Sequence, residues 1–364
     1  MLTERVNEIR DMAQCVSEEW KNEGRSLESF CDIVDRHFSA RAFEELSDIS
    51  NLQSLLGDPA IAKLQTGSTF SDAHFKLFDD GYFWIEILTW WSSDVNAHDH
   101  DFSAIQYQLL GESIDVKYKF VPSVEDGSLE VGEVVAEGLQ VWSPGTKSVV
   151  VPGRTEPHLV YHLDQPTVSL LVRTHPREEI GGQRNYFPPF VRADYTEIDN
   201  AFRLNLKYLR LLSKDENKDR FAEVFRRSVL RQTANETMLM FSKLNDILFS
   251  PKHADVLAWY VESGAPGAVE IVQCASKIHT SNYVSDYLRK SPTSSREDRK
   301  ILSAFAASYD VDSFRSLCSQ IPGLEDVDVE RALRQALGNS LEALPEWHAR
   351  ETRRVTELHG LSVI

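Results

Sequence analysis

The sequence has few cysteines, and they show none of the spacings that cysteine chemistry requires. Four are scattered over 364 residues without a C-x-x-C pair: Cys15, Cys31, Cys274 and Cys318. Scattered cysteines without a C-x-x-C pair indicate neither a disulfide framework nor a zinc ribbon. The pattern is typical of reduced thiols and predicts a cytoplasmic protein.

Long apolar runs and an excess of positive charge are also missing. No uninterrupted apolar stretch approaches the roughly 20 residues of a transmembrane helix. The charged N-terminus lacks the apolar core of a signal peptide. Lys and Arg number 39 against 56 Asp and Glu, a formal net charge of −17. Nucleic acids and anionic membranes attract clustered cations, so we expect neither as a partner.

Several common catalytic motifs are absent as well. The sequence contains no P-loop, no G-x-G-x-x-G fingerprint and no G-x-S-x-G nucleophile turn,. An H-x-D metal triad would need an aspartate two residues after a histidine. In the run His98-Asp99-His100 the acid instead falls between the histidines. Phosphate binding by a P-loop and serine hydrolysis are therefore not indicated, and the His98-Asp99-His100 run does not have the order of an H-x-D triad.

Hydrophobic periodicity divides the chain into three zones. Residues 1–66 carry apolar side chains at three- and four-residue spacing, which predicts an N-terminal helical segment. Over residues 67–190 the period changes to two, in many short segments separated by Gly, Pro, Asp and Asn. Such segments predict an antiparallel β-sandwich or β-barrel. After the proline-rich join "YFPPFVRAD", helical spacing over residues 191–364 predicts a C-terminal helical domain,.

The strand zone holds a pair of histidines in "NAHDHDFS". His98 and His100 are two residues apart, so in a strand they project from the same face. Imidazole nitrogens at that spacing can share one metal ion. A third ligand must come from another strand, and "PGRTEPHLVYHLDQ" offers His158 and His162.

The same alternation places other polar side chains beside the candidate metal site. Gln106 shares the even-numbered face with His98 and His100 if the strand continues, and could be a fourth ligand or a hydrogen-bonding partner of the ligands. In "TVSLLVRTH" the apolar even-numbered residues alternate with an odd-numbered set that ends in Arg173 and His175. Arg173 is suited to binding a substrate carboxylate; the alternative is an ion pair with an internal acid such as Glu156.

The segments around these histidines resemble the two motifs of the cupin superfamily. "HDHDFSAIQYQLLG" has the paired histidines and the closing glycine of the first motif, with Gln106 in the window where the family has glutamate. "GTKSVVVPGRTEPH" places a histidine after a Pro-Gly turn, as the second motif does. The resemblance implies an α+β fold, with a cupin jelly-roll barrel flanked by helices. It also implies that His158 is the third ligand, with His162 as the alternate.

Within the cupins, the chain is most similar to the thiol (cysteine) dioxygenases. "HDH" followed by "QLLGES", and "HLDQPTVSLLVRTH", carry the similarity. It implies a non-haem Fe(II) ion held by His98, His100 and His158, with O2 activated at the open coordination positions. The S-x-H-x-Y triad of that family falls on Ser169, Leu171 and Arg173.

We therefore expect a metal-dependent cupin dioxygenase or related oxidoreductase that acts on a small thiol- or amine-bearing molecule and O2. Candidate catalytic residues are Arg173, Gln106 and Tyr161. Fe(II) is the expected cofactor, and Zn, Ni or Mn are alternatives that would support isomerase or hydrolytic chemistry. The alternative class is a non-catalytic cupin that binds or senses a ligand, with its C-terminal helices as an interaction domain. A homodimer is a possible assembly.

Overall fold

The computed structural model describes residues 2–66, 71–91, 96–126, 129–194, 199–214 and 218–357. Contacts divide the chain into two compact units. One comprises residues 1–95, 99–117 and 139–183, and the other residues 96–98, 118–138 and 184–364. The strands β3, β5 and β6 are continuous across this division. The predicted boundary between residues 66 and 67 adjoins residues 67–70, which lie outside the described residues, and the three-zone division stays a prediction.

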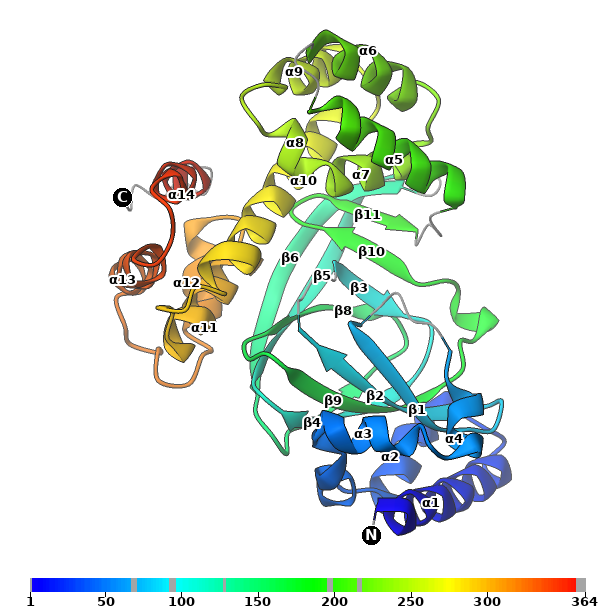
Figure 1. The fold of residues 1–364 in the computed structure, drawn as a ribbon. Helices are drawn as coiled ribbons and strands as arrows, with labels where there is room; N and C mark the ends of the chain where they lie inside the picture. The colour runs from blue at the N-terminus through cyan, green and yellow to red at the C-terminus, as the bar shows by residue number, and fades with distance from the viewer. Residues whose placement is uncertain are drawn as a thin grey trace. The chain divides into compact units, whose positions relative to one another are not determined.

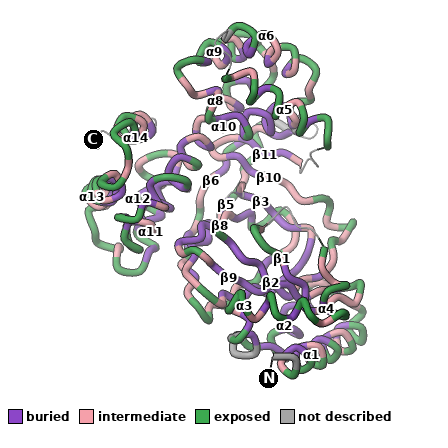
Figure 2. The backbone as a smooth tube through the Cα atoms, viewed as in Figure 1, coloured by how far each residue is buried: buried purple, intermediate pink, exposed green. Residues whose placement is uncertain are grey.

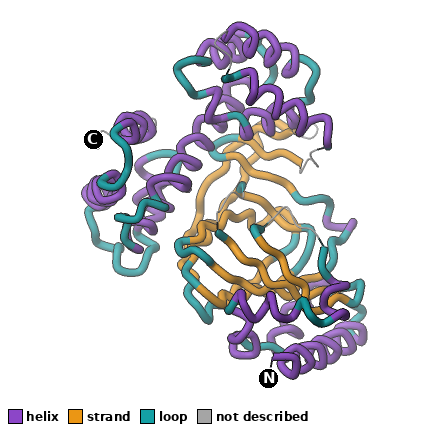
Figure 3. Tube along the Cα trace, in the orientation of Figure 1, coloured by secondary structure: helices purple, strands orange, loops and turns teal. Residues whose placement is uncertain are grey.

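Helices and strands alternate in blocks along the chain, as Figure 3 shows. Side chains cap the start of several helices in the N-terminal block. Ser26 accepts from the backbone of α2, and Asp58 caps α4 directly before Pro59,. The N-terminal helices are α1 (Leu2–Asn22), α2 (Leu27–His37), the 3-10 helix η1 (Ala40–Ser47), α3 (Ile49–Leu55) and α4 (Pro59–Leu64).

A five-stranded sheet packs against these helices (Figure 1). Its order is β1-β2-β9-β4-β7. The strands are β1 (Ala73–Asp79), β2 (Phe83–Trp90), β4 (Ala104–Leu110), β7 (Lys147–Val150) and β9 (Thr167–Thr174). Val168, Leu170 and Val172 belong to the core that also contains Trp20 and Phe30 of the helices. The predicted alternation along β9 is confirmed, and Arg173 lies on the opposite face from this core.

The remaining strands form a closed barrel in the order β10-β11-β6-β5-β8-β3. They are β3 (Ala97–His100), β5 (Ser113–Asp126), β6 (Leu129–Trp142), β8 (Gly153–His162), β10 (Arg184–Phe187) and β11 (Val191–Asp194). β5 and β8 pair antiparallel, with Lys117 opposite His158 and Ser113 opposite His162. Both strands are largely buried where they pair (Figure 2). The predicted α+β class and antiparallel barrel are confirmed, whereas the jelly roll stays a prediction.

Helices follow the barrel strands to the end of the described chain. Those between residues 200 and 283 share a second core with strands of the barrel, around buried side chains such as Phe225, Phe241 and Ile271. The bounds of all these helices are α5 (Asn200–Leu212), α6 (Lys218–Val229), α7 (Ala234–Lys243), α8 (Asn245–Leu248), α9 (Ala254–Glu262), α10 (Ala268–Tyr283), α11 (Arg296–Ala307), α12 (Val311–Cys318), α13 (Val329–Leu341) and α14 (Trp347–Glu357). A 3-10 helix, η2 (Glu178–Ile180), precedes β10, and a π-helical turn, η3 (Val284–Leu288), follows α10. Within the described residues, no helix has the length and apolar character that crossing a membrane requires.

Candidate metal centre

Three buried histidines come together at β3 and β8. His98 and His100 lie on β3 and His158 on β8, and one ring nitrogen from each lies within 4.8 Å of the other two. Two-residue spacing on one strand brings the first pair together, as the sequence predicts. The third comes from a strand about sixty residues later. Among the described residues, this is a group able to hold a metal ion.

The ring contacts of these histidines show which nitrogen is directed at the shared site. Nδ1 of His98 lies 2.8 Å from the carbonyl oxygen of Asn96. Nδ1 of His158 lies 2.6 Å from Oδ1 of Asp115. A metal-binding histidine usually donates its other ring N–H to a carbonyl or carboxylate, as both of these do. Nε2 is therefore the candidate ligand atom of both residues.

The spacing of the nitrogens fits a first-row metal ion. Nε2 of His100 and Nε2 of His158 are 2.9 Å apart. Two nitrogens bound at about 2.0–2.1 Å and at right angles to one another are about 2.9 Å apart. At a tetrahedral angle they would be about 3.4 Å apart. The donor set consists of neutral imidazoles and suits Zn, Cu, Fe or Ni, so these residues fit the metal that the sequence predicts.

Asp115 is an acid on β5 that contacts His158 on the paired strand β8. Its side chain is completely buried, and Lys117 Nζ lies 3.4 Å from its Oδ2. Burial alone would raise the pKa of the Asp115 carboxyl, but the nearby His158 and Lys117 outweigh burial and lower it,. The group is therefore held as a carboxylate, a strong acceptor for the His158 ring.

His162 has a different environment from His158. Its Nδ1 lies 3.0 Å from Ser113 Oγ, and its ring stacks on Trp90 with centroids 4.6 Å apart. It does not belong to the group of nitrogens described above. The assignment of His158 as the third ligand, with His162 as the alternate, stays a prediction.

Arg173 lies one aromatic ring away from His100. Its guanidinium covers the Phe102 ring at 3.4 Å and the Trp84 ring at 4.4 Å. Phe102 in turn contacts the His100 ring, with centroids 4.5 Å apart. Burial lowers the pKa of the Arg173 guanidinium, against the attraction of Glu86 and Asp101. The Arg173 guanidinium is therefore held between two aromatic rings, one of which contacts His100.

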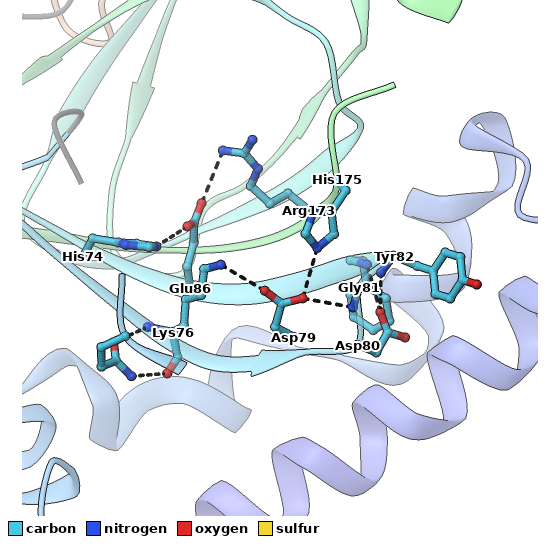
Figure 4. A network of polar contacts seen from close by, with 11 residues as sticks. His74, Lys76, Asp79, Asp80, Gly81, Tyr82, Glu86, Arg173 and His175 are labelled. Carbon is cyan, nitrogen blue, oxygen red and sulfur yellow. Dashed lines mark hydrogen bonds and ion pairs between the residues drawn. The ribbon is translucent and has the colours of Figure 1, made fainter. Parts of the chain in front are cut away.

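The acid that pairs with Arg173 is Glu86, as Figure 4 shows. The two side chains lie 3.6 Å apart, and His74 Nε2 contacts the other oxygen of Glu86 at 2.5 Å. The expected pairing with an internal acid is therefore present, but its identity differs from Glu156, which lies 3.7 Å from Lys117. A second set of contacts in Figure 4 joins Asp79 to His175 and Lys76.

Gln106 is not on the same strand as the histidine pair. β3 ends at His100 and β4 begins at Ala104 in the other sheet. The prediction that Gln106 shares a face with His100 assumed one continuous strand, and these residues lie on two different strands. Gln106 lies opposite Leu171 of β9 and Ser148 of β7 and is buried. Its role in catalysis stays a prediction.

Tyr161 is buried on β8, opposite Ile114. The β5–β8 register has no irregularity between residues 158 and 162. Tyr161 therefore projects from the face opposite to His158 and His162. Its catalytic role also stays a prediction, and any such role would be indirect.

A buried cysteine lies close to the segment that follows His100. Cys31 Sγ is 3.2 Å from Ser103 Oγ and donates to the carbonyl oxygen of Ala104. The spacing of cysteines in the sequence gives no sign of this proximity, because α2 packs onto β4 only in the folded chain. Burial raises the pKa of the Cys31 thiol, and a protonated thiol is a weak nucleophile.

Sequence reasoning missed two groups that surround the histidines. They are Asp115, which contacts His158, and Phe102, which contacts His100. The alternation of "SIDVKYKFV" places Asp115 and Lys117 on one face,. That pattern is a usable signal once the pairing of this strand with β8 is known.

The comparisons with known proteins give similar structures but no family. No protein-family model matches the chain, and no curated protein matches it. It is similar in structure to the DMSP lyase DddQ from Ruegeria pomeroyi (14% identity, 35% of this chain and 59% of the lyase, TM-score 0.22). Hydroquinone 1,2-dioxygenase from a Sphingomonas species matches at 14% identity over 33% of this chain and 72% of the dioxygenase, with a TM-score of 0.23.

A sugar phosphate isomerase of the cupin superfamily from Silicibacter pomeroyi is similar as well. The identity is 12% over 36% of this chain and 83% of the isomerase, with a TM-score of 0.23. Cupin-type proteins are thus among the solved structures that this chain is similar to. The chain spans only 59% of the lyase's length. At TM-scores of 0.22 and 0.23, these similarities carry no information about its own reaction.

Proposed function

We propose that this chain is a cupin-type metalloenzyme, a non-haem iron dioxygenase acting on a small thiol- or amine-bearing molecule with O2. The observation that carries the proposal is the group of three buried histidine nitrogens, within 4.8 Å of one another. Three protein ligands leave coordination positions for substrate and O2, as catalytic metal sites require. The thiol-dioxygenase resemblance of the sequence supports iron over Zn, Ni or Mn.

The surrounding residues are suited to holding such a centre among buried side chains. The metal would supply Lewis acidity and one-electron chemistry with O2. His98, His100 and His158 would hold it, with Asn96 and Asp115 fixing two of the rings. Arg173, flanked by Phe102 and Trp84, would attract an anionic group of the substrate,.

O2 uptake by iron-loaded protein tests this function. Wild-type protein reconstituted anaerobically with Fe(II) is screened against small thiols and amines in an oxygen electrode. We expect at least one compound to produce catalytic O2 uptake that His100→Ala abolishes and His162→Ala retains. Binding of nitric oxide, an O2 analogue, measured by electron paramagnetic resonance, reports the open coordination positions without any knowledge of the substrate.

Two results would contradict the proposal. Equal O2 uptake by wild type and His100→Ala would separate the reaction from the histidines. An iron-loaded protein that does not bind nitric oxide would lack the open positions. Tight binding of a compound without O2 consumption would favour the alternative class, a ligand-binding cupin.

A further inference from the structure

The Asp115 carboxylate is fully buried, and other groups must offset the free-energy cost of that burial. Its side chain has a solvent exposure of 0%, and a lone buried carboxylate is strongly unfavourable. Two contacts offset this cost. Oδ1 accepts from Nδ1 of His158 at 2.6 Å, and Oδ2 lies 3.4 Å from Nζ of Lys117. Lys117 also reaches Glu156, at 3.7 Å on the more exposed side.

The register of β5 and β8 places Asp115 beside the metal ligand. Lys117 lies directly opposite His158, and Asp115 lies opposite Val160. Residues two apart on one strand share a face, so Asp115 and His158 form a diagonal cross-strand pair. Asp115 and His158 thus lie on two strands, β5 and β8, whose backbones are paired with each other. A one-residue slip of β5 would turn the carboxylate to the opposite face.

The Nδ1 contacts of His98 and His158 differ in charge. Nδ1 of His98 faces the neutral carbonyl of Asn96, whereas Nδ1 of His158 faces a carboxylate. A carboxylate fixes the Nδ1–H tautomer and increases the basicity of the Nε2 lone pair more than a carbonyl does. Of these two contacts, the one between Asp115 and His158 therefore fixes its histidine ring more strongly.

We infer that Asp115 is a positioning residue of the metal centre, acting through His158 and held in place by Lys117. This inference rests on the metal site of the proposed function but not on its oxygenase chemistry. Asp115 orients the His158 ring, keeps its proton on Nδ1, and so presents Nε2 toward Nε2 of His100, 2.9 Å away. The metal affinity therefore depends on Asp115, although Asp115 is not itself a metal ligand.

Asp115→Asn tests this inference, since asparagine keeps the acceptor oxygen and removes the charge. We expect it to weaken Co(II) binding by about 10- to 100-fold in a calorimetric titration, as is typical for loss of such partners. The stoichiometry stays the same, and the visible Co(II) absorption bands shift. Asp79→Asn is the matched control, because Asp79 makes the same kind of contact with His175, which is not a ligand. It is expected to bind Co(II) as wild type does.

A measurement on unaltered protein covers the case in which Asp115→Asn does not fold. In Zn(II)-loaded wild type labelled with ¹⁵N-histidine, long-range proton–nitrogen spectra identify the protonated nitrogen of each ring. We expect His158 to carry its proton on Nδ1 and to bind the metal through Nε2. Binding through Nδ1 would overturn the inference, as would Asp115→Asn binding Co(II) within about twofold of wild type. If wild type binds no metal at all, the proposed function itself fails.

Discussion

His100→Ala is expected to abolish stoichiometric metal binding, whereas His162→Ala leaves it intact. Nε2 of His100 lies 2.9 Å from Nε2 of His158, in the position of a neighbouring ligand. Nδ1 of His162 contacts Ser113, and its ring packs on Trp90. The two residues are both buried histidines of the strand zone, so the comparison separates ligation from general loss of an imidazole.

The size of the effect follows from the number of ligands. Loss of an outer partner alone costs about 10- to 100-fold in affinity. Removing one of three direct ligands is expected to cost more than about 100-fold, measured by Co(II) titration of variants with native circular dichroism spectra. His98→Ala and His158→Ala are expected to behave like His100→Ala. Native affinity in His158→Ala together with a loss in His162→Ala would reassign the third ligand.

Glu86→Leu is expected to destabilise the fold by about 3 kcal/mol, since removing one partner of a buried pair leaves an uncompensated charge. Arg173 lies between the rings of Phe102 and Trp84, and Glu86 is its partner at 3.6 Å. Glu86 also contacts His74. Urea unfolding of both proteins at pH 7 measures the difference in the free energy of unfolding.

A double-variant cycle provides the control. Glu86→Leu/Arg173→Met removes both charges and is expected to recover more than half of the lost stability. If the double variant is less stable than Glu86→Leu by as much as Arg173→Met alone destabilises the wild type, the two side chains are not coupled. In that case the arginine is stabilised mainly by its two aromatic neighbours.

The pH dependence of the Glu86 effect has a defined sign. Burial pushes the pKa of Glu86 upward, but His74 and Arg173 outweigh it, and the pKa lies below its ordinary value of 4.5. A lowered carboxyl pKa contributes stability that is fully present above the ordinary value and is lost as the pH falls through the folded-state value. The stability difference between wild type and Glu86→Leu is therefore expected to be constant near pH 7 and to shrink only below about pH 4.5.

Strand alternation made much of the site predictable from the sequence. His98 and His100 share a face because they are two residues apart on one strand. The alternation of β9 also holds, with Val168, Leu170 and Val172 in the core and Arg173 on the opposite face. These features depend only on local geometry, which the sequence pattern reports directly.

Features that depend on which strands pair were not predictable. Asp115 reaches His158 only because β5 pairs with β8 in one particular register. The partner of Arg173 is Glu86 on the neighbouring strand β2, and the sequence offers many acids for that place. The sequence pattern groups Gln106 with the histidines only if alternation continues across residues 101–103, but there the chain passes from one sheet to the other.

The most direct test of the account is the metal content of wild-type protein purified without oxygen. Three convergent imidazoles with fixed outer partners predict about one first-row ion per chain by elemental analysis, or one after addition of Fe(II). A protein that is isolated without metal, and that stays metal-free after addition of Fe(II), Co(II) or Zn(II), would contradict the central claim.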